Sequence, residues 1–163
     1  MEILANIINK IGRSIAWLVL AMVLLIFLIV LGRYVFNAGS IAIQEAATYL
    51  HAMVFMLAAA WTLSEDGHVR VDIFYRDASP RHKAWVNFLG SLVFLLPFAI
   101  FILVTSWNYV AASWAVYEGS REAGGLPLVW LLKSLMPLFA LLLISQGLLL
   151  ALKSLDQIRI SSP

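Results

Sequence analysis

The stretch SIAWLVLAMVLLIFLIVLG, residues 14–32, contains no charged side chain and is almost entirely apolar. A helix of about 20 such residues crosses the hydrocarbon core of a bilayer, which is roughly 30 Å thick. Because lipid offers no hydrogen bonds to the backbone, a helix that satisfies its own N–H and C=O groups is the expected conformation. The stretch therefore predicts a transmembrane helix.

Three further stretches, residues 46–64, 84–117 and 134–152, also lack Asp, Glu, Lys and Arg. The whole chain is 63% hydrophobic and 12% charged, whereas a soluble domain is about half apolar and a quarter charged. None of the stretches alternates polar and apolar residues as a membrane β-strand does. We predict one all-α membrane domain over residues 1–163, with spans at about 14–36, 44–64, 84–110 and 128–152.

The basic residues predict the orientation, because Lys and Arg in short loops stay on the cytoplasmic side. The two termini and the second loop hold eight of the eleven basic residues, and the first and third loops hold three. Both termini are therefore expected in the cytoplasm. The inner residues are Lys10, Arg13, Arg70, Arg76, Arg81, Lys83, Lys153 and Arg159, and the outer ones are Arg33, Arg121 and Lys133.

The tryptophans fall near both predicted boundaries, where indole rings anchor helices in the headgroup layer. We interpret them as anchors and not as a cofactor cage. They are Trp17, Trp61 and Trp85 on the inner side, and Trp107, Trp114 and Trp130 on the outer side.

The four spans differ in character. Residues 1–13 are amphipathic, which predicts either a short helix on the inner surface or an extension of span one. Span three is longer than a bilayer requires, so either residues 108–117 project beyond the outer face or the helix tilts strongly, and Pro97 is a position at which it can kink. The small residues of span two predict an internal packing helix, and spans one and four are expected to be mostly anchors.

Ionisable side chains are scarce within the spans, where they usually mark ion or substrate pathways. Only His51 lies well inside one, and a lone histidine is more often a packing residue than a proton relay. The chain has no cysteine and no phosphate-binding glycine loop, which argues against thiol chemistry and ATP-driven transport. The sequence therefore predicts a protein without its own translocation or catalytic site.

Three loops carry the candidate structural residues. At the first outer turn, Arg33, Tyr34 and Asn37 precede Glu45 at the start of span two. An arginine and a carboxylate at two ends of a tight hairpin can pair, and Glu45 is also placed near a helix N-terminus that favours negative charge. We hypothesise an Arg33–Glu45 pair, with two separately solvated residues as the alternative.

In the inner loop, His68, Arg70 and Asp72 alternate with apolar residues, as in an extended segment with one apolar face. Two of these side chains could ligate a metal, but a third ligand is not apparent, so no metal site is predicted. The residues Ser79 and Pro80 have the pattern of a cap at the start of span three.

The outer loop between spans three and four contains a glycine pair and a proline, which predict a tight connection. Its candidate interface residues are Glu118, Ser120, Gly125 and Pro127. The charges of this loop are expected either to meet a soluble partner or to be simply solvated.

These three loops together resemble the small membrane subunit of tripartite ATP-independent periplasmic (TRAP) transporters, the DctQ-like family. The resemblance covers nearly the whole chain. One departure is visible at residues 40–44, where family members often carry a tryptophan. The matching stretches are residues 32–37 with Glu45, residues 67–72, and Glu118 and Ser120 with residues 124–127.

The resemblance implies a role that no motif shows directly. It implies a non-catalytic scaffold subunit in the bacterial inner membrane, in a transporter driven by an ion gradient that takes up organic acids. The implied partners are a large many-span permease subunit, a periplasmic solute-binding protein and membrane lipids, with no nucleic acid and no cofactor. A self-sufficient homo-oligomeric transporter or channel is the alternative, and a membrane enzyme is a third class.

Overall fold

The structure of this chain, a computed structural model, describes residues 2–68 and 75–160, apart from the side chains of residues 2 and 4. Every regular element in this part of the chain is helical, as the sequence predicts. The elements are α1 (Glu2–Val35), α2 (Ile41–Ser64), α3 (Pro80–Gly90), the π-helical turn η2 (Ser91–Leu95), α4 (Leu96–Ala115) and α5 (Val129–Ile160).

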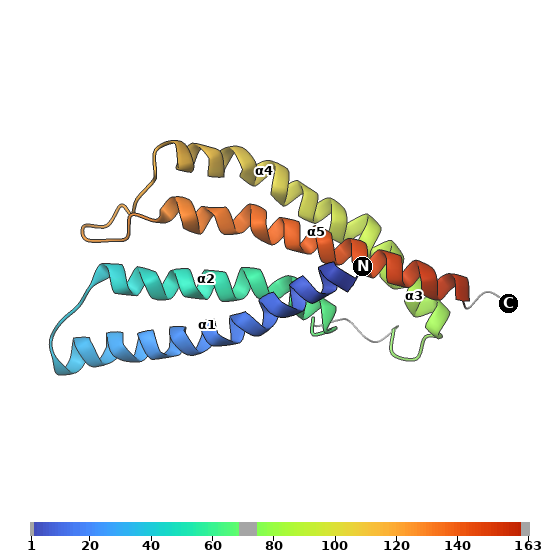
Figure 1. The fold of residues 1–163 in the computed structure, drawn as a ribbon, viewed down its shortest axis with the longest axis horizontal. Coiled ribbons are helices and arrows are strands. Elements are labelled where there is room, and N and C mark those ends of the chain that lie inside the picture. Colours follow the sequence, from blue (N-terminus) through green and yellow to red (C-terminus); the bar gives the residue numbers. More distant parts are fainter. Residues whose placement is uncertain (1, 69–74, 161–163) are drawn as a thin grey trace.

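Four helical segments are long and apolar enough to cross a membrane, which confirms the expected number of spans. The helices run beyond the predicted spans at most ends. The helix α1 continues without a break from Glu2, so the amphipathic N-terminal residues extend span one. Ile8 within this extension and Ile15 just beyond it are buried, and the N-terminal part of α1 passes across α5 (Figure 1).

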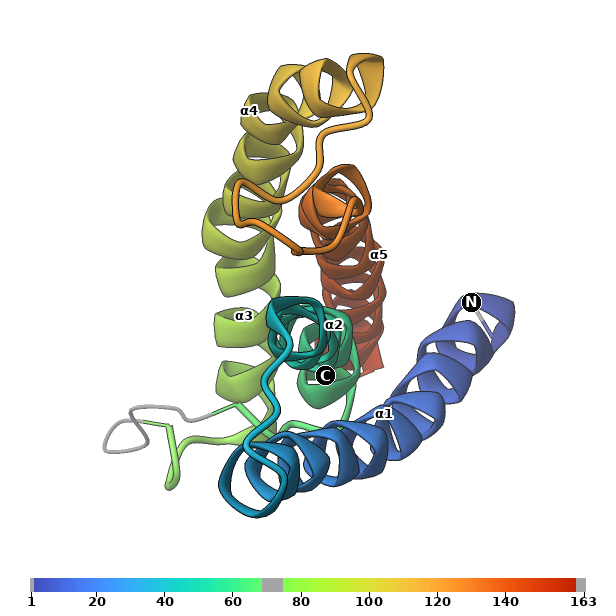
Figure 2. The same ribbon diagram turned by 90° about the vertical axis from the view of Figure 1, so that its left-hand side faces the viewer.

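The spans form a curved row, one helix thick, and not a closed bundle. Contacts join α1 to α2, α2 to α5, and α5 to the continuous helix formed by α3, η2 and α4, and α1 also touches α5 where its N-terminal part crosses it. The order α4, α5, α2, α1 is visible from the side in Figure 1 and along the helices in Figure 2. Within the described residues, α1 and α2 make no packing contact with α4, so each helix keeps surface open to its surroundings.

The helix α5 is the centre of this row, which corrects the expectation that span four is mostly an anchor. It has the largest buried share of the four spans, and α1 has the smallest. Ala140 is fully buried, and a Cβ on Gly147 would come within 3.0 Å of the Leu95 side chain. The sequence did not predict this role, because α5 is rich in leucine and leucine packs equally well against lipid and against a neighbouring helix. Span two does lie between two helices, α1 and α5.

The π turn η2 ends at Leu95, two residues before Pro97, which is the proline expected to kink span three. Proline has no N–H to donate to the preceding turn, and π turns are a common way to absorb such a gap. Here the Leu96 N–H bonds to the carbonyl of Ser91, five residues back. The helix then continues, so residues 80–115 form one segment of 36 residues, about 54 Å long at 1.5 Å per residue.

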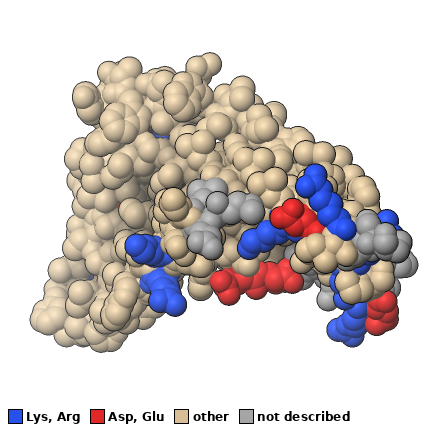
Figure 3. All heavy atoms as spheres, turned by 45° about the vertical axis from the view of Figure 1, so that its right-hand side comes forward, with Lys and Arg blue, Asp and Glu red and all other residues tan. Residues whose placement is uncertain are grey.

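At the opposite end from the two short hairpins, Ser79 caps α3 as predicted. Its side chain accepts a hydrogen bond from the His82 N–H at 3.3 Å, and Pro80 occupies the first helical turn. Both termini lie toward this end (Figure 1). Figure 3 brings it forward and shows charged side chains gathered in the lower part of the view, beside a broad uncharged surface. Following the predicted orientation, we call this the inner end and the hairpin end the outer end.

The contact between α1 and α2 gives a first prediction. Gly12 lies against Trp61, and a Cβ there would come within 2.6 Å of the Trp61 Cδ1 atom. We expect Gly12→Ala to lower the stability of the purified protein, by about 1–3 kcal/mol if the ring cannot move. Thermal unfolding in detergent measures this change.

The matched control is Gly90→Ala, since nothing lies within 4 Å of that Cβ position. Both substitutions raise helix propensity, so Gly90→Ala is expected to leave stability unchanged or raise it. If Gly12→Ala behaves like Gly90→Ala, the close contact of α1 with Trp61 is wrong.

Candidate functional site: the outer polar cluster

The polar side chains of the outer end gather around the loop between α4 and α5. Glu45 reaches this loop from α2, and Glu118 in the loop pairs with Lys133 of α5. We call Glu45, Glu118, Ser120 and Lys133 the outer polar cluster. It joins α2 to the hairpin of α4 and α5, which lies far from α2 in the sequence.

Glu45 holds the loop through both of its carboxylate oxygens. Oε1 accepts a hydrogen bond from the Ser120 hydroxyl, and Oε2 accepts one from the Leu126 N–H at 2.6 Å. These partners lie 75 and 81 residues away along the chain. Polar groups at the edge of lipid are costly to leave unpaired. The Glu45 carboxylate therefore stabilises the loop by pairing with a hydroxyl and a backbone N–H.

The hypothesis of an Arg33–Glu45 pair is wrong. The structure gives no ion pair between Arg33 and Glu45, both of which it describes, and Arg33 is exposed. The helix α2 also begins at Ile41, earlier than predicted, so Glu45 lies beyond its first turn. The helix dipole has little effect there; the donors of the loop hold the carboxylate instead.

The loop folds tightly because its own polar groups pair internally. The Ser120 N–H donates to the Leu126 carbonyl at 2.9 Å, and the Glu122 N–H donates to the Ser120 hydroxyl at 3.1 Å. Gly124 has a φ of +78°, a conformation that side chains disfavour. A Cβ on Gly125 would overlap Ser120 and come within 2.9 Å of the Glu45 carboxylate. Gly125 therefore makes room for Ser120 and Glu45, and Gly124 supplies the backbone conformation of the turn.

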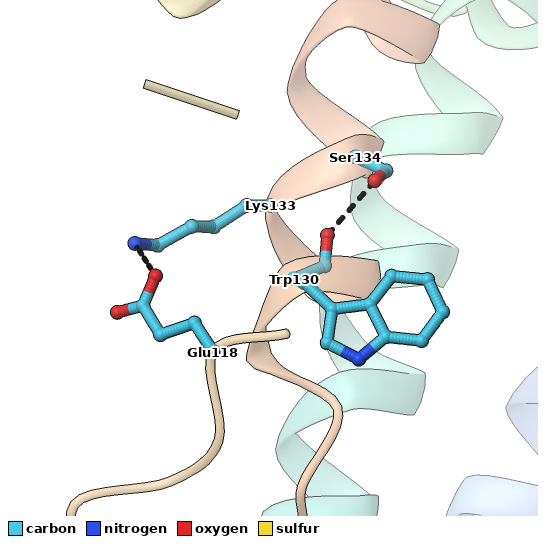
Figure 4. A network of polar contacts seen from close by, with 4 residues as sticks. All are labelled: Glu118, Trp130, Lys133 and Ser134. Atoms are coloured by element: carbon cyan, nitrogen blue, oxygen red, sulfur yellow. Dashed lines mark hydrogen bonds and ion pairs between the residues drawn. The ribbon is translucent and has the colours of Figure 1, made fainter. Parts of the chain in front are cut away.

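The second half of the cluster is the ion pair of Glu118 and Lys133, which Figure 4 shows reaching from the loop to α5. The Lys133 ammonium also lies 3.9 Å from the centre of the Tyr109 ring on α4, in a cation–π arrangement. The hydrogen bond from Lys133 holds the pKa of Glu118 below its ordinary value. The pair therefore favours the ionised carboxylate and ties the loop to both helices of this hairpin.

Aromatic rings surround the start of α5. Trp114 and Trp130 pack edge to face with ring centres 4.4 Å apart, and Tyr117 adds a second such contact to Trp130 at 6.0 Å. The Trp114 ring N–H donates to Ser134 Oγ at 2.8 Å, and Ser134 in turn donates to the Trp130 carbonyl (Figure 4). Trp114 and Trp130 therefore pack α4 against α5, a role separate from the predicted anchoring of tryptophans in the headgroup layer.

The other predicted interface residues lie apart from the cluster. Arg33, Tyr34 and Asn37 are exposed at the turn between α1 and α2, and Asn37 ends α1 with a φ of 47°. His68 lies at the inner end, where its Nε2 atom is 3.2 Å from the Ala59 carbonyl. Arg70 and Asp72 lie outside the described residues.

Pro127 is exposed, and its carbonyl accepts a hydrogen bond from the Trp130 ring at 3.2 Å. The sequence analysis missed the roles of Lys133 and Tyr109 in the cluster. The sequence analysis used Lys133 only to assign the outer side. A lysine one helical turn into a span is unusual unless an acidic side chain pairs with it. That position was the available signal for a nearby carboxylate.

The cluster's chemistry is structural. Each carboxylate is occupied by donors of the same chain, and the described residues contain no group of three His, Asp or Glu side chains placed to hold a metal ion. The effect of the cluster is to fix the loop on α2 and α5.

Comparison with known proteins assigns this chain to a family. The family model described as "Tripartite ATP-independent periplasmic transporters, DctQ component" matches residues 22–157. The chain belongs to this DctQ family. The family is one of transporter components in the bacterial membrane, and the four candidate spans of this chain make it a multi-pass membrane protein.

Two curated relatives agree with the family. The chain is 31% identical over 97 residues to a putative TRAP transporter small permease protein of Haemophilus influenzae, covering 59% of this chain and 60% of the relative. It is 30% identical over 95 residues to the C4-dicarboxylate TRAP transporter small permease protein DctQ of Vibrio cholerae, covering 58% of this chain and 40% of the relative. No solved structure matches the chain.

The contact between Glu45 and the loop predicts a coupled effect of two substitutions in this DctQ-family protein. Gly125→Ala should push the loop from the carboxylate, and Glu45→Gln should leave one acceptor oxygen for the two donors, Ser120 and Leu126. Each is expected to lower the unfolding temperature in detergent. The double variant should be little worse than the poorer single variant, because both remove the same interaction.

Gly39→Ala is the control, since Gly39 lies in the other outer turn and has nothing within 4 Å of its Cβ position. Fully additive losses in the double variant would contradict the contact between Glu45 and this loop.

The ion pair predicts a pH dependence with a definite sign. Because the folded-state pKa of Glu118 is lowered from 4.5, the pair stabilises the protein above that pH and loses its effect as the pH falls through the lowered value. The difference in unfolding temperature between the wild type and Glu118→Gln should be constant from pH 7 to about 5 and shrink below pH 4.5. A difference that persists unchanged at pH 3 would show that the charge is not the cause.

Proposed function

We propose that this chain is the small, non-catalytic subunit of an ion-gradient-driven tripartite transporter for organic-acid uptake. In this proposal it is a fixed scaffold for the large permease subunit, and its outer end helps to dock the periplasmic binding protein. Family membership supports the general role of transporter component. The particular roles are inferred from the geometry below.

The observation that carries the proposal is the single row of helices. A translocation path needs to be enclosed by several helices, and the described helices lie side by side with surface open on the row. The ionised side chains of the outer polar cluster lie near the ends of the spans and bind one another. This arrangement supports a chain that holds its shape beside a transporting subunit.

The outer polar cluster supports rigidity. It joins the start of α2 to the hairpin of α4 and α5, so the outer ends of three spans are held together by hydrogen bonds and an ion pair. Lower along the helices, Ala60 and Ala140 are almost fully buried, which lets neighbouring helices approach closely. A scaffold beside a moving subunit needs such resistance to deformation.

The same loop supports a docking role at the outer end. Arg121 and Glu122 are exposed next to the cluster, with no ion pair given for either in the described structure. Because Ser120 and Gly125 are fixed from below by Glu45, these two charges are presented on an ordered loop. Charged groups on an ordered loop outside the membrane suit a soluble, oppositely patterned surface.

The alternative function is a self-sufficient homo-oligomeric transporter or channel. It requires polar pathway residues within the spans. Near the middle of the described spans, His51 is the only acidic or basic side chain. The buried polar residues are serines and a single glutamine, with Gln146 on α5, so this alternative has less support.

Vesicle uptake tests the proposal. The large permease subunit, the binding protein and this chain are reconstituted together, and a C4-dicarboxylate is the first substrate to try, because the Vibrio cholerae relative is named for it. We expect uptake that needs an ion gradient and falls to background when this chain is omitted. Gradient-driven uptake by this chain alone would overturn the scaffold role and favour the alternative.

A further inference from the structure

One face of α2 carries polar side chains at the level of the membrane and is left open by the rest of the chain. Gln44, Thr48, His51 and Phe55 follow one another at intervals of four and three residues, so they share one side of the helix. All four are exposed, and Phe55 is 72% exposed. We call these four residues the α2 polar face.

His51 is the side chain that needs a partner. It is the eleventh of the 24 residues of α2, near the middle of the span. The Thr48 hydroxyl is satisfied, because it donates to the Gln44 carbonyl at 3.3 Å. No hydrogen bond reaches the His51 ring from the described part of the chain. Lipid tails cannot supply one, so a ring in this place favours contact with a polar group of another protein.

The exposed faces of the other spans differ from this one in chemistry. The open side of α5 presents Leu138, Leu141 and Leu148, and that of η2 and α4 presents Phe94 and Phe98. Lipid tails suit such side chains, so these faces call for no protein partner. The α2 polar face therefore stands out among the exposed mid-span surfaces of the described helices.

We propose that a transmembrane helix of the large permease subunit packs on the α2 polar face, with a hydrogen-bonding side chain of that helix meeting the His51 ring. This inference rests on the proposed function. Polar complementarity selects the occupant, because a partner helix can offer a donor or acceptor at mid-membrane depth. The exposed Phe55 ring, one turn away, is the kind of aromatic anchor that fills a pocket in a partner.

Site-specific photo-cross-linking tests the location. A photoreactive phenylalanine analogue replaces Phe55 in one variant, and Phe94 or Phe27 in two controls, which are 74% and 59% exposed in the same chain. Each variant is co-expressed with the large permease subunit, irradiated in native membranes and analysed by mass. We expect a cross-link to the large subunit from position 55, at several times the yield from either control.

Substitution of the histidine tests the chemistry. We expect His51→Leu to lower the amount of large subunit that co-purifies by about three- to tenfold, the effect of about one interhelical hydrogen bond. His51→Asn keeps a hydrogen-bonding group and should retain most of the binding. The unfolding temperature of the His51→Leu chain by itself should not fall, which separates lost binding from misfolding.

The results of these two experiments distinguish a failure of the proposed contact on α2 from a failure of the proposed function. Equal or higher cross-linking from position 94 or 27, or a product of twice the mass of this chain from position 55, overturns the α2 polar face as the permease contact. So does unchanged co-purification of His51→Leu. A wild-type chain that does not co-purify with the large subunit at all overturns the proposed function as well.

Discussion

Lipid offers no hydrogen bonds, and this single constraint shapes each part of the molecule. It makes the four apolar stretches helical, since only a helix satisfies its own backbone within one segment. It also explains the local exceptions. Where Pro97 lacks an N–H, the chain shifts to a π turn in which the Leu96 N–H bonds to Ser91. Where the loop leaves the Leu126 N–H without a helical partner, Glu45 accepts it.

The lipid environment also explains why the helices can remain in a single row. A row one helix thick leaves large surfaces facing outward, and most of them carry leucine, phenylalanine or valine, which lipid accommodates. The buried residues of the described helices are mostly leucines, isoleucines and alanines, with a few serines and no charged side chain. Such a layer is suited to lie against a larger membrane protein, and membership of a tripartite transporter family supplies a context for that role.

The fold was largely predictable from composition and charge. The four charge-free stretches predicted the four spans, and Ser79 with Pro80 predicted the start of α3. The ranking of the spans was not predictable. A helix such as α5, which is leucine-rich on all sides, has the same hydropathy whether it faces lipid or protein, so its central place was missed. The informative residues were the small ones, Ala140 and Gly147, at the spacing of one helical face.

The sequence by itself determined that this chain is a helical membrane protein with few ionisable groups inside its spans, because hydropathy and charge act over local windows. It also singled out Glu45, Glu118 and Ser120 of the outer polar cluster, but in separate motifs and without Lys133. Only the tertiary structure decided how they combine: Glu45 bonds to a loop more than 70 residues away and not to nearby Arg33. Partners at that separation depend on how helices pack, and no local pattern records which of several available donors a carboxylate will meet.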